Sequence, residues 1–121
     1  MPAKILIIED SPDVREALKL LIEMEGYEVA VAMNGAEALE RATSEKPDLV
    51  LMDLVLPDTS GLDLTREMRS YPDMADVPIL CVSSYAEGIE SVVRAAGCQE
   101  VFSKTAFIKS FRATLKKYLG E

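Results

Sequence analysis

The sequence predicts an α/β protein in which helices cover both faces of an open, doubly wound parallel sheet of five strands. Short apolar runs alternate five times with segments of helical periodicity, which is the pattern of repeated strand–helix units. The central run is apolar almost throughout instead of alternating, as expected of a strand that is buried on both faces. Five strands are few for a closed eight-stranded barrel, so the sheet is expected to be open.

The first unit comprises a strand over residues 4–9 and a helix that begins after Ser11. Serine is a favoured N-cap residue, and Pro12 suits the first helical position, where the backbone N–H would have no helical partner. Gly26 is placed to end this helix.

The second unit comprises a strand over residues 27–33, rich in valine and alanine, and a helix over residues 36–44. The sequence Asn34-Gly35 closes the strand. Leu39 and Ala42 mark the apolar side of a helix with modest amphipathicity.

The third unit begins with the apolar run of residues 49–56, which Pro57 closes and in which Asp53 is the single carboxylate. An ionised aspartate inside a buried strand would suffer a large desolvation cost. That cost is tolerable where the strand ends and the backbone leaves the core, and parallel sheets place their ligand crevices at those ends. A loop over residues 58–61 and a helix over residues 62–70 are expected to follow.

The last two units follow a polar connection over residues 71–77. A strand over residues 78–83 ends in hydroxyls, and a short strand over residues 100–103 leads to Lys104. The fourth helix is marked by apolar residues at helical spacing and a closing glycine: Ile89, Val92, Val93, Ala96 and Gly97. The last helix carries the apolar stripe Phe107, Ile108, Phe111, Leu115 and Leu119.

Composition narrows the class of function. The chain has 121 residues and a net charge of -8, which suits one soluble domain and argues against nucleic acid as a direct partner. No run approaches the about 20 apolar residues of a membrane helix, and the first residues lead into a strand instead of a signal sequence, so no membrane contact is expected. Cys81 and Cys98 have neither CxxC nor metal-ligand spacing. Cys81 is predicted to be a buried free thiol, and the protein to be cytoplasmic.

Polar side chains follow four of the five predicted strands, and in a parallel sheet they share one edge. They are Glu9-Asp10, Asp53, Ser83-Ser84 and Ser103-Lys104. Clustered carboxylates repel each other unless a cation joins them, and oxygen donors without histidine favour Mg²⁺. An opposing ammonium and a hydroxyl suit a transferring phosphoryl group, which makes the Asp53 carboxylate a candidate nucleophile.

Each of these residues also has a structural interpretation. The acidic pair after the first strand favours a helix start, the serines after the fourth strand suit a helix cap, and Asp53 suits a turn. Lys104 alone would be a solvated charge. Because all of these residues lie at the ends of strands that share one edge of the sheet, we favour the interpretation that they form a site for Mg²⁺ and phosphoryl transfer.

Four segments together resemble the receiver domain of two-component response regulators, in the form of a chemotaxis-regulator-like single domain. They are Lys-Ile-Leu-Ile-Ile-Glu-Asp at 4–10, Leu-Met-Asp-Leu-Val-Leu-Pro-Asp-Thr-Ser-Gly at 51–61, Val-Ser-Ser-Tyr-Ala-Glu at 82–87 and Phe-Ser-Lys at 102–104. Each segment is weakly specific, but their order and separation are highly specific. The resemblance covers essentially all of residues 1–121, and it implies a flavodoxin-like (βα)5 fold with strand order 2-1-3-4-5.

The resemblance also implies roles for individual residues. Asp53 matches the phosphoacceptor, Ser83 the switch hydroxyl that turns towards the phosphoryl group, and Lys104 the phosphate-pairing lysine. The implied Mg²⁺ ligands are Asp10 directly, Glu9 mostly through water, the Asp53 carboxylate and the backbone carbonyl of Val55. Phosphate in this family comes from a phosphohistidine on a sensor histidine kinase or phosphotransfer protein. The sequence contains no histidine, so this chain is not such a donor.

Two positions depart from the family pattern. The switch aromatic, three residues before the lysine, is here Val101, and Phe102 is expected to point to the opposite side of its strand. The proline that normally follows the lysine, often through a cis peptide, is here Thr105. A non-proline cis bond costs roughly 3 kcal/mol, so a trans bond is expected. These departures bear on the usual switch more than on the phosphoryl chemistry.

The predicted function is therefore that of a phosphoacceptor signalling domain, not an enzyme, which relays its state to a downstream protein through the fourth helix, fifth strand and fifth helix. A haloacid-dehalogenase-like phosphatase would need an aspartate where the chain has Val55. A flavodoxin-like cofactor binder would need a phosphate loop where residues 9–13 are acidic. The remaining alternative is a phosphorylation-independent receiver-like interaction module, which Val101 and Thr105 favour and the intact acids oppose.

Overall fold

The computed structural model describes residues 2–84 and 87–120, and within that part of the chain five strands form one parallel sheet. The strands are β1 (Lys4–Ile8), β2 (Glu28–Ala32), β3 (Leu49–Met52), β4 (Ile79–Val82) and β5 (Glu100–Phe102). They pair in the order β2-β1-β3-β4-β5, which confirms the predicted fold class and strand order. Tyr85 and Ala86, which belong to the third of the family-like segments, lie outside the described residues.

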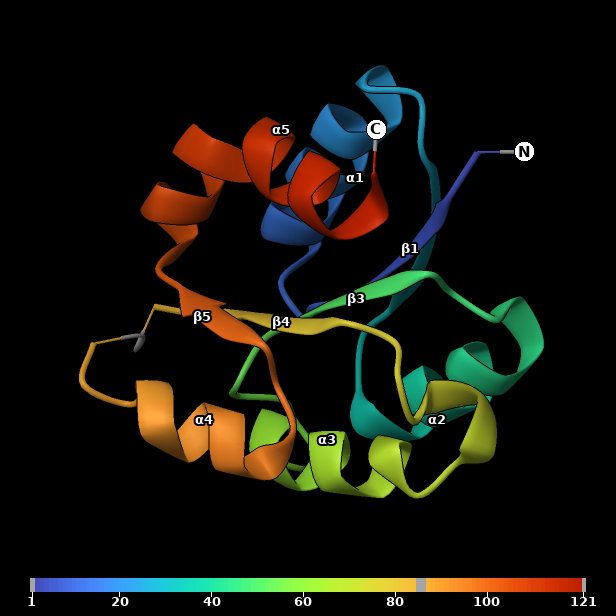
Figure 1. Cartoon of the computed structure of the whole chain (residues 1–121), viewed down its shortest axis with the longest axis vertical. Helices are drawn as coiled ribbons and strands as arrows, with labels where there is room; N and C mark the ends of the chain where they lie inside the picture. Colours follow the sequence, from blue (N-terminus) through green and yellow to red (C-terminus); the bar gives the residue numbers. More distant parts are fainter. Residues whose placement is uncertain (1, 85–86, 121) are drawn as a thin grey trace.

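Helices cover the sheet on both faces, as Figure 1 shows. They are α1 (Pro12–Met24), α2 (Gly35–Glu45), α3 (Gly61–Arg69), α4 (Glu90–Ala96) and α5 (Lys104–Leu119), together with the 3-10 turn η1 (Pro72–Met74). Helices α1 and α5 lie on one face, and α2, α3 and α4 lie on the other (Figure 1). Among the described residues, no helix has both the length and the apolar character that crossing a membrane requires.

Successive residues of the central strands enter two separate cores, because side chains alternate across a strand. Ile5 and Ile7 of β1 pack into the core beneath α1 and α5, which also contains Phe107. Leu6 and Ile8 pack into the opposite core beneath α2, α3 and α4. These four side chains of β1 are buried, which explains why residues 5–8 are apolar throughout.

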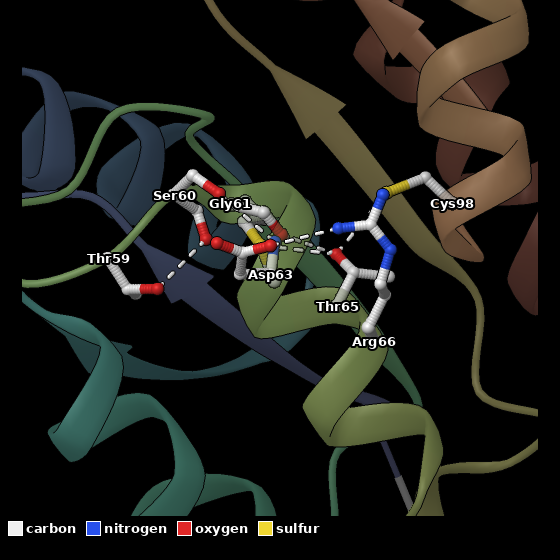
Figure 2. A network of polar contacts seen from close by, with 8 residues as sticks. Thr59, Ser60, Gly61, Asp63, Thr65, Arg66 and Cys98 are labelled. Carbon is white, nitrogen blue, oxygen red and sulfur yellow. Dashed lines mark hydrogen bonds and ion pairs between the residues drawn. The ribbon is translucent and has the colours of Figure 1, made fainter.

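The helix starts follow the local sequence. Ser11 caps α1 and Pro12 occupies its first turn, as predicted. Asn34 caps α2 by accepting a hydrogen bond from the Glu37 N–H at 2.8 Å. Ser60 caps α3 by accepting from the backbone N–H of Asp63 at 3.1 Å (Figure 2). These caps satisfy backbone donors that the first helical turn leaves without a partner.

Three parts of the predicted core pattern are wrong. The connection over residues 71–77 contains η1, and its Met74 is fully buried. Val92 of α4 and Ile108 of α5 were expected on buried faces, but both are exposed. The adjacent residues Val93 and Phe107, which the same stripes include, are buried as expected, because neighbouring helical positions point about 100° apart and here only one of each pair faces the core.

The side chain of Arg69, at the end of α3, joins three segments that are distant in sequence. Its guanidinium donates at 2.6 Å to the carbonyl oxygens of Met74 and Val77. It also donates to the carbonyl of Gly97, after α4, at 2.7 and 3.1 Å. The guanidinium therefore connects α3, the η1 connection and the end of α4.

Replacing Arg69 by alanine is expected to lower the free energy of unfolding by about 2–3 kcal/mol, because part-buried carbonyls lose a charged donor. Urea denaturation at constant m-value measures this change. Arg66→Ala is the matched control, because Arg66 lies on the same helix in an exposed ion pair with Asp63 (Figure 2) and should cost less than about 1 kcal/mol. Equal losses in the two variants would contradict the role assigned to Arg69.

Candidate functional site

Strands β1 and β3 deliver two buried carboxylates to the carboxyl edge of the sheet. The ladder continues one residue beyond each strand, since the Glu9 N–H donates to the Ala32 carbonyl and the Asp53 N–H to the Ile8 carbonyl, both at 3.0 Å. Glu9 is 3% exposed and Asp53 is 8% exposed. Their backbones are therefore fixed by the sheet, and their side chains lie side by side where the core ends.

Asp10 joins these two residues to form an acidic cluster. One carboxylate oxygen from each of Glu9, Asp10 and Asp53 lies within 4.8 Å of the other two. Asp10 is exposed, so the cluster is open to water on one side. A set of oxygen donors with an open side fits a hard divalent cation, which takes one or two carboxylates and fills its remaining positions with water or phosphate oxygens.

Lys104 brings an ammonium group to the same place, as the strand-end pattern predicts. It is the first residue of α5, which Ser103 caps. Its Nζ atom lies 3.3 Å from Oε1 of Glu9 and 3.7 Å from Oδ2 of Asp53, and its side chain is 30% exposed. The structural interpretation of Lys104 as a solvated charge is therefore wrong. One ammonium does not balance three carboxylates, which leaves the cluster able to attract a further cation.

The pKa of Glu9 is raised above its ordinary value, mainly because burial disfavours the charged form. The Ser11 N–H opposes this shift by donating to Oε2 of Glu9 at 3.1 Å. The nearby Asp53 carboxylate raises the pKa further, whereas Lys104 lowers it. Arg15 donates to the Glu9 carbonyl at 3.1 Å and adds a positive charge beside the site that the sequence analysis missed.

Ser83 lies directly after β4, as the strand-end pattern predicts, and Val55 lies two residues after Asp53. Ser83 follows β4, where its N–H donates to the Phe102 carbonyl at 3.0 Å, and it is buried. Helix α4 begins at Glu90 after Ile89, so the alternative in which Ser83 caps this helix is wrong. Val55 donates its N–H to Oδ1 of Asp53 at 3.3 Å, and its side chain is exposed to water.

Gly61, the first residue of α3, supports the site in a way that the sequence analysis missed. A Cβ atom at this position would lie 2.5 Å from the carbonyl oxygen of Asp53 and 2.9 Å from Cα of Leu54. Only glycine allows α3 to approach the backbone of Asp53 so closely. Its place directly after the cap residue Ser60 (Figure 2) was the available sequence signal, but the approach itself depends on the packing of α3.

At the two positions that depart from the family pattern, Val101 and Thr105, the structure has the expected side-chain direction and a trans peptide bond. Val101 contacts the core on the α4 side of the sheet, whereas Phe102 packs on the other side, with its ring 5.7 Å from that of Phe107. Among residues 2–84 and 87–120 every peptide bond is trans, including the bond before Thr105. The aromatic ring of β5 therefore contacts α5 instead of the face that α4 covers.

Comparison with known proteins identifies the family. The family model "Response regulator receiver domain" matches residues 5–116. The polar-differentiation response regulator DivK of Brucella anthropi is 37% identical over 122 residues, an alignment that covers 100% of this chain and 99% of DivK.

Two similar solved structures contain magnesium. The response regulator TrrA of Thermotoga maritima in complex with Mg²⁺-BeF is 33% identical with a TM-score of 0.85, covering 98% of this chain and 99% of that one. The receiver domain of the Pseudomonas aeruginosa PAO1 sensor histidine kinase PA1611, with magnesium in its active-site cleft, is 26% identical with a TM-score of 0.89, and all of both chains is covered. The chain belongs to the response regulator receiver domain family, whose members act in phosphorylation-dependent two-component signalling.

Proposed function

We propose that this chain accepts a phosphoryl group on Asp53 from a phosphohistidine of a sensor histidine kinase or phosphotransfer protein, in a reaction that requires Mg²⁺. The observation that carries the proposal is the approach of the Lys104 ammonium to two acids of a three-carboxylate cluster. The proposed metal ligands are Glu9, mostly through water, Asp10, the Asp53 carboxylate and the Val55 carbonyl.

The proposed step is a displacement at phosphorus. A carboxylate oxygen of Asp53 forms the new O–P bond while the P–N bond of the donor breaks and its imidazole leaves with the electron pair. The Val55 N–H holds Oδ1 of Asp53, and Oδ2 faces Lys104. The ammonium then neutralises charge on the phosphoryl oxygens, and a bound Mg²⁺ would supply a second positive charge there.

The phosphoryl group is proposed to act through the face formed by α4, β5 and α5. Lys104 begins α5, and Ser83, which follows β4, donates its N–H to the Phe102 carbonyl of β5, so both proposed contacts of the phosphoryl group adjoin this face. A bound group shifts a conformational equilibrium only by the difference in its contacts with the two states. A downstream protein that binds this face would then respond to the population of the phosphorylated state.

Residues 1–121 are proposed to form one receiver domain. The cytoplasmic location of the protein stays a prediction.

Incubation with acetyl phosphate tests the proposal directly. Intact-mass measurement is expected to show one added phosphoryl group in the presence of Mg²⁺ and none when EDTA removes the ion. No mass change in Mg²⁺ would contradict the proposal and favour the phosphorylation-independent interaction module. An equal mass change with EDTA would refute the role of the metal cluster.

The exposed side chain of Val55 predicts a long-lived phosphoryl-aspartate. Val55 is 59% exposed beside Asp53, and an aliphatic side chain cannot orient an attacking water. Val55→Asn is expected to accelerate loss of the phosphoryl group by about 10-fold, which is less than the about 10²–10⁴-fold of general acid–base catalysis, because an amide can orient the attacking water but cannot take its proton. Mass measurement after removal of acetyl phosphate gives the rate. Val92→Asn is the control, because it makes the same change at an exposed position on α4. An unchanged rate in Val55→Asn would contradict this role.

A further inference from the structure

The core beneath α3 and α4 contains two cysteines whose sulfur atoms are in contact. Cys81 is the third residue of β4, and Cys98 lies in the turn between α4 and β5. Both are free and buried, and their Sγ atoms are 3.0 Å apart although they are separated by 17 residues. A disulfide has a length of about 2.05 Å, so a modest approach of the two sulfur atoms would allow the bond.

The polar surroundings of this pair favour the thiolate of Cys98. Thr65 of α3 donates its hydroxyl to the Gly61 carbonyl at 2.8 Å, and the same oxygen lies 3.4 Å from Sγ of Cys98 (Figure 2). The hydrogen bond with the Cys81 thiol is the main reason that the pKa of Cys98 is lowered, while burial opposes the shift. The positive charge of Arg69 acts in the same direction as the Thr65 hydroxyl. A thiolate is the form of cysteine that reacts with peroxides and disulfides.

The turn that holds Cys98 lies outside the strands and is fastened by the hydrogen bonds that Arg69 donates to the Gly97 carbonyl. It follows α4, which has 7 residues, and Gly97 ends that helix in the left-handed conformation. Short elements at the surface open locally at a lower free energy than global unfolding. Cys98 is 3% exposed, so a small oxidant would reach it only when this turn opens, whereas Cys81 is held within β4.

We propose that Cys81 and Cys98 form a reversible intrachain disulfide when a peroxide oxidises the protein. The Cys98 thiolate attacks one oxygen of hydrogen peroxide, and the O–O bond breaks to give a sulfenic acid and, after protonation, water. The Cys81 sulfur then attacks the Cys98 sulfur, and the S–O bond breaks to release a second water. Two thiols are oxidised and one peroxide is reduced, and a dithiol reductant restores both thiols.

A disulfide between Cys81 and Cys98 would restrict the relative motion of two segments of the fold. It would tie β4, two residues before Ser83, to the turn that joins α4 to β5. Relative motion of these segments would then be restricted by a covalent bond. Formation of the disulfide does not depend on phosphoryl transfer, so the Asp53→Asn variant is expected to form it as the parent does.

The test treats the folded protein with hydrogen peroxide, blocks the remaining thiols under denaturing conditions and measures intact mass. The expected result is loss of two hydrogen atoms with no blocked cysteine, a Cys81–Cys98 crosslink in the peptide map, and full recovery of both thiols with dithiothreitol. Two reactive thiols after treatment, separate oxidation of each cysteine, or crosslinks only between chains would overturn the proposal.

Two variants keep the test decisive. Cys81→Ala removes the resolving sulfur, and the variant is expected to accumulate sulfenic acid or higher oxides on Cys98 without an intrachain crosslink. If this variant fails to fold, Thr65→Val retains both cysteines and removes only the hydroxyl that faces Cys98, and it is expected to form the same crosslink more slowly. Equally fast crosslinking in the unfolded parent chain would show that the folded arrangement contributes nothing.

Discussion

Replacing Asp53 by asparagine is expected to abolish phosphoryl uptake from acetyl phosphate. The variant keeps the size and shape of the side chain, and the amide oxygen can still accept the Val55 N–H. An amide is not a nucleophile towards phosphorus, and it also removes one charge from the acidic cluster. Intact mass in the presence of Mg²⁺ should therefore show unmodified protein over the time in which the parent is fully converted.

Asp63→Asn provides the matched control for this experiment. Asp63 is an exposed carboxylate in the first turn of α3, outside the acidic cluster, and its loss should leave uptake unchanged. Circular dichroism of both variants checks that the fold is retained. A phosphoryl group on the Asp53→Asn variant, mapped to another residue, would show that the acceptor has been assigned to the wrong residue.

Replacing Lys104 by methionine is expected to slow phosphoryl uptake by about 10²–10³-fold, the usual effect of removing one preorganised donor from developing charge. Methionine retains the length of the side chain and loses only the ammonium that lies 3.7 Å from Asp53. The acids lose their neighbouring cation, so the affinity for Mg²⁺ should stay the same or rise. The time course of mass change gives the rate, and titration with Mg²⁺ gives the affinity.

Lys109→Met is the control for this variant, because Lys109 is an exposed lysine of the same helix. It should leave both the rate and the affinity for Mg²⁺ unchanged. Rates that are equal in the Lys104→Met variant and the parent would mean that the ammonium group does not act on the transferring group. A large loss of Mg²⁺ affinity would instead indicate that the variant disturbs the acidic cluster.

Most of the fold and of the acidic cluster could be predicted because both follow from local pattern. The apolar run before Asp53 is buried on both faces, and the parallel sheet then brings Glu9, Asp53 and Lys104 to one edge. Contacts that depend on how helices and turns pack against the sheet could not be predicted from the local sequence pattern. The approach of Gly61 to the backbone of Asp53 depends on how α3 packs against the end of β3.

The contact between Cys81 and Cys98 is of the same kind. It depends on the register of β4 against β5 and on the turn after α4. The spacing of the two cysteines in the sequence predicts neither of these features. The exposure of Val92 has a related cause, because a helix as short as α4 offers too few turns for its apolar period to fix which residue faces the sheet.

Helix α5 links the acidic edge to the opposite end of the molecule because Lys104 is its first residue. A helix of 16 residues is about 24 Å long, and hydrogen bonds along its length make it behave as a stiff rod. Near its far end, Lys117 forms an ion pair of 2.8 Å with Glu100 at the start of β5. Because the helix is stiff, a displacement of its Lys104 end would be carried along its length towards that second contact.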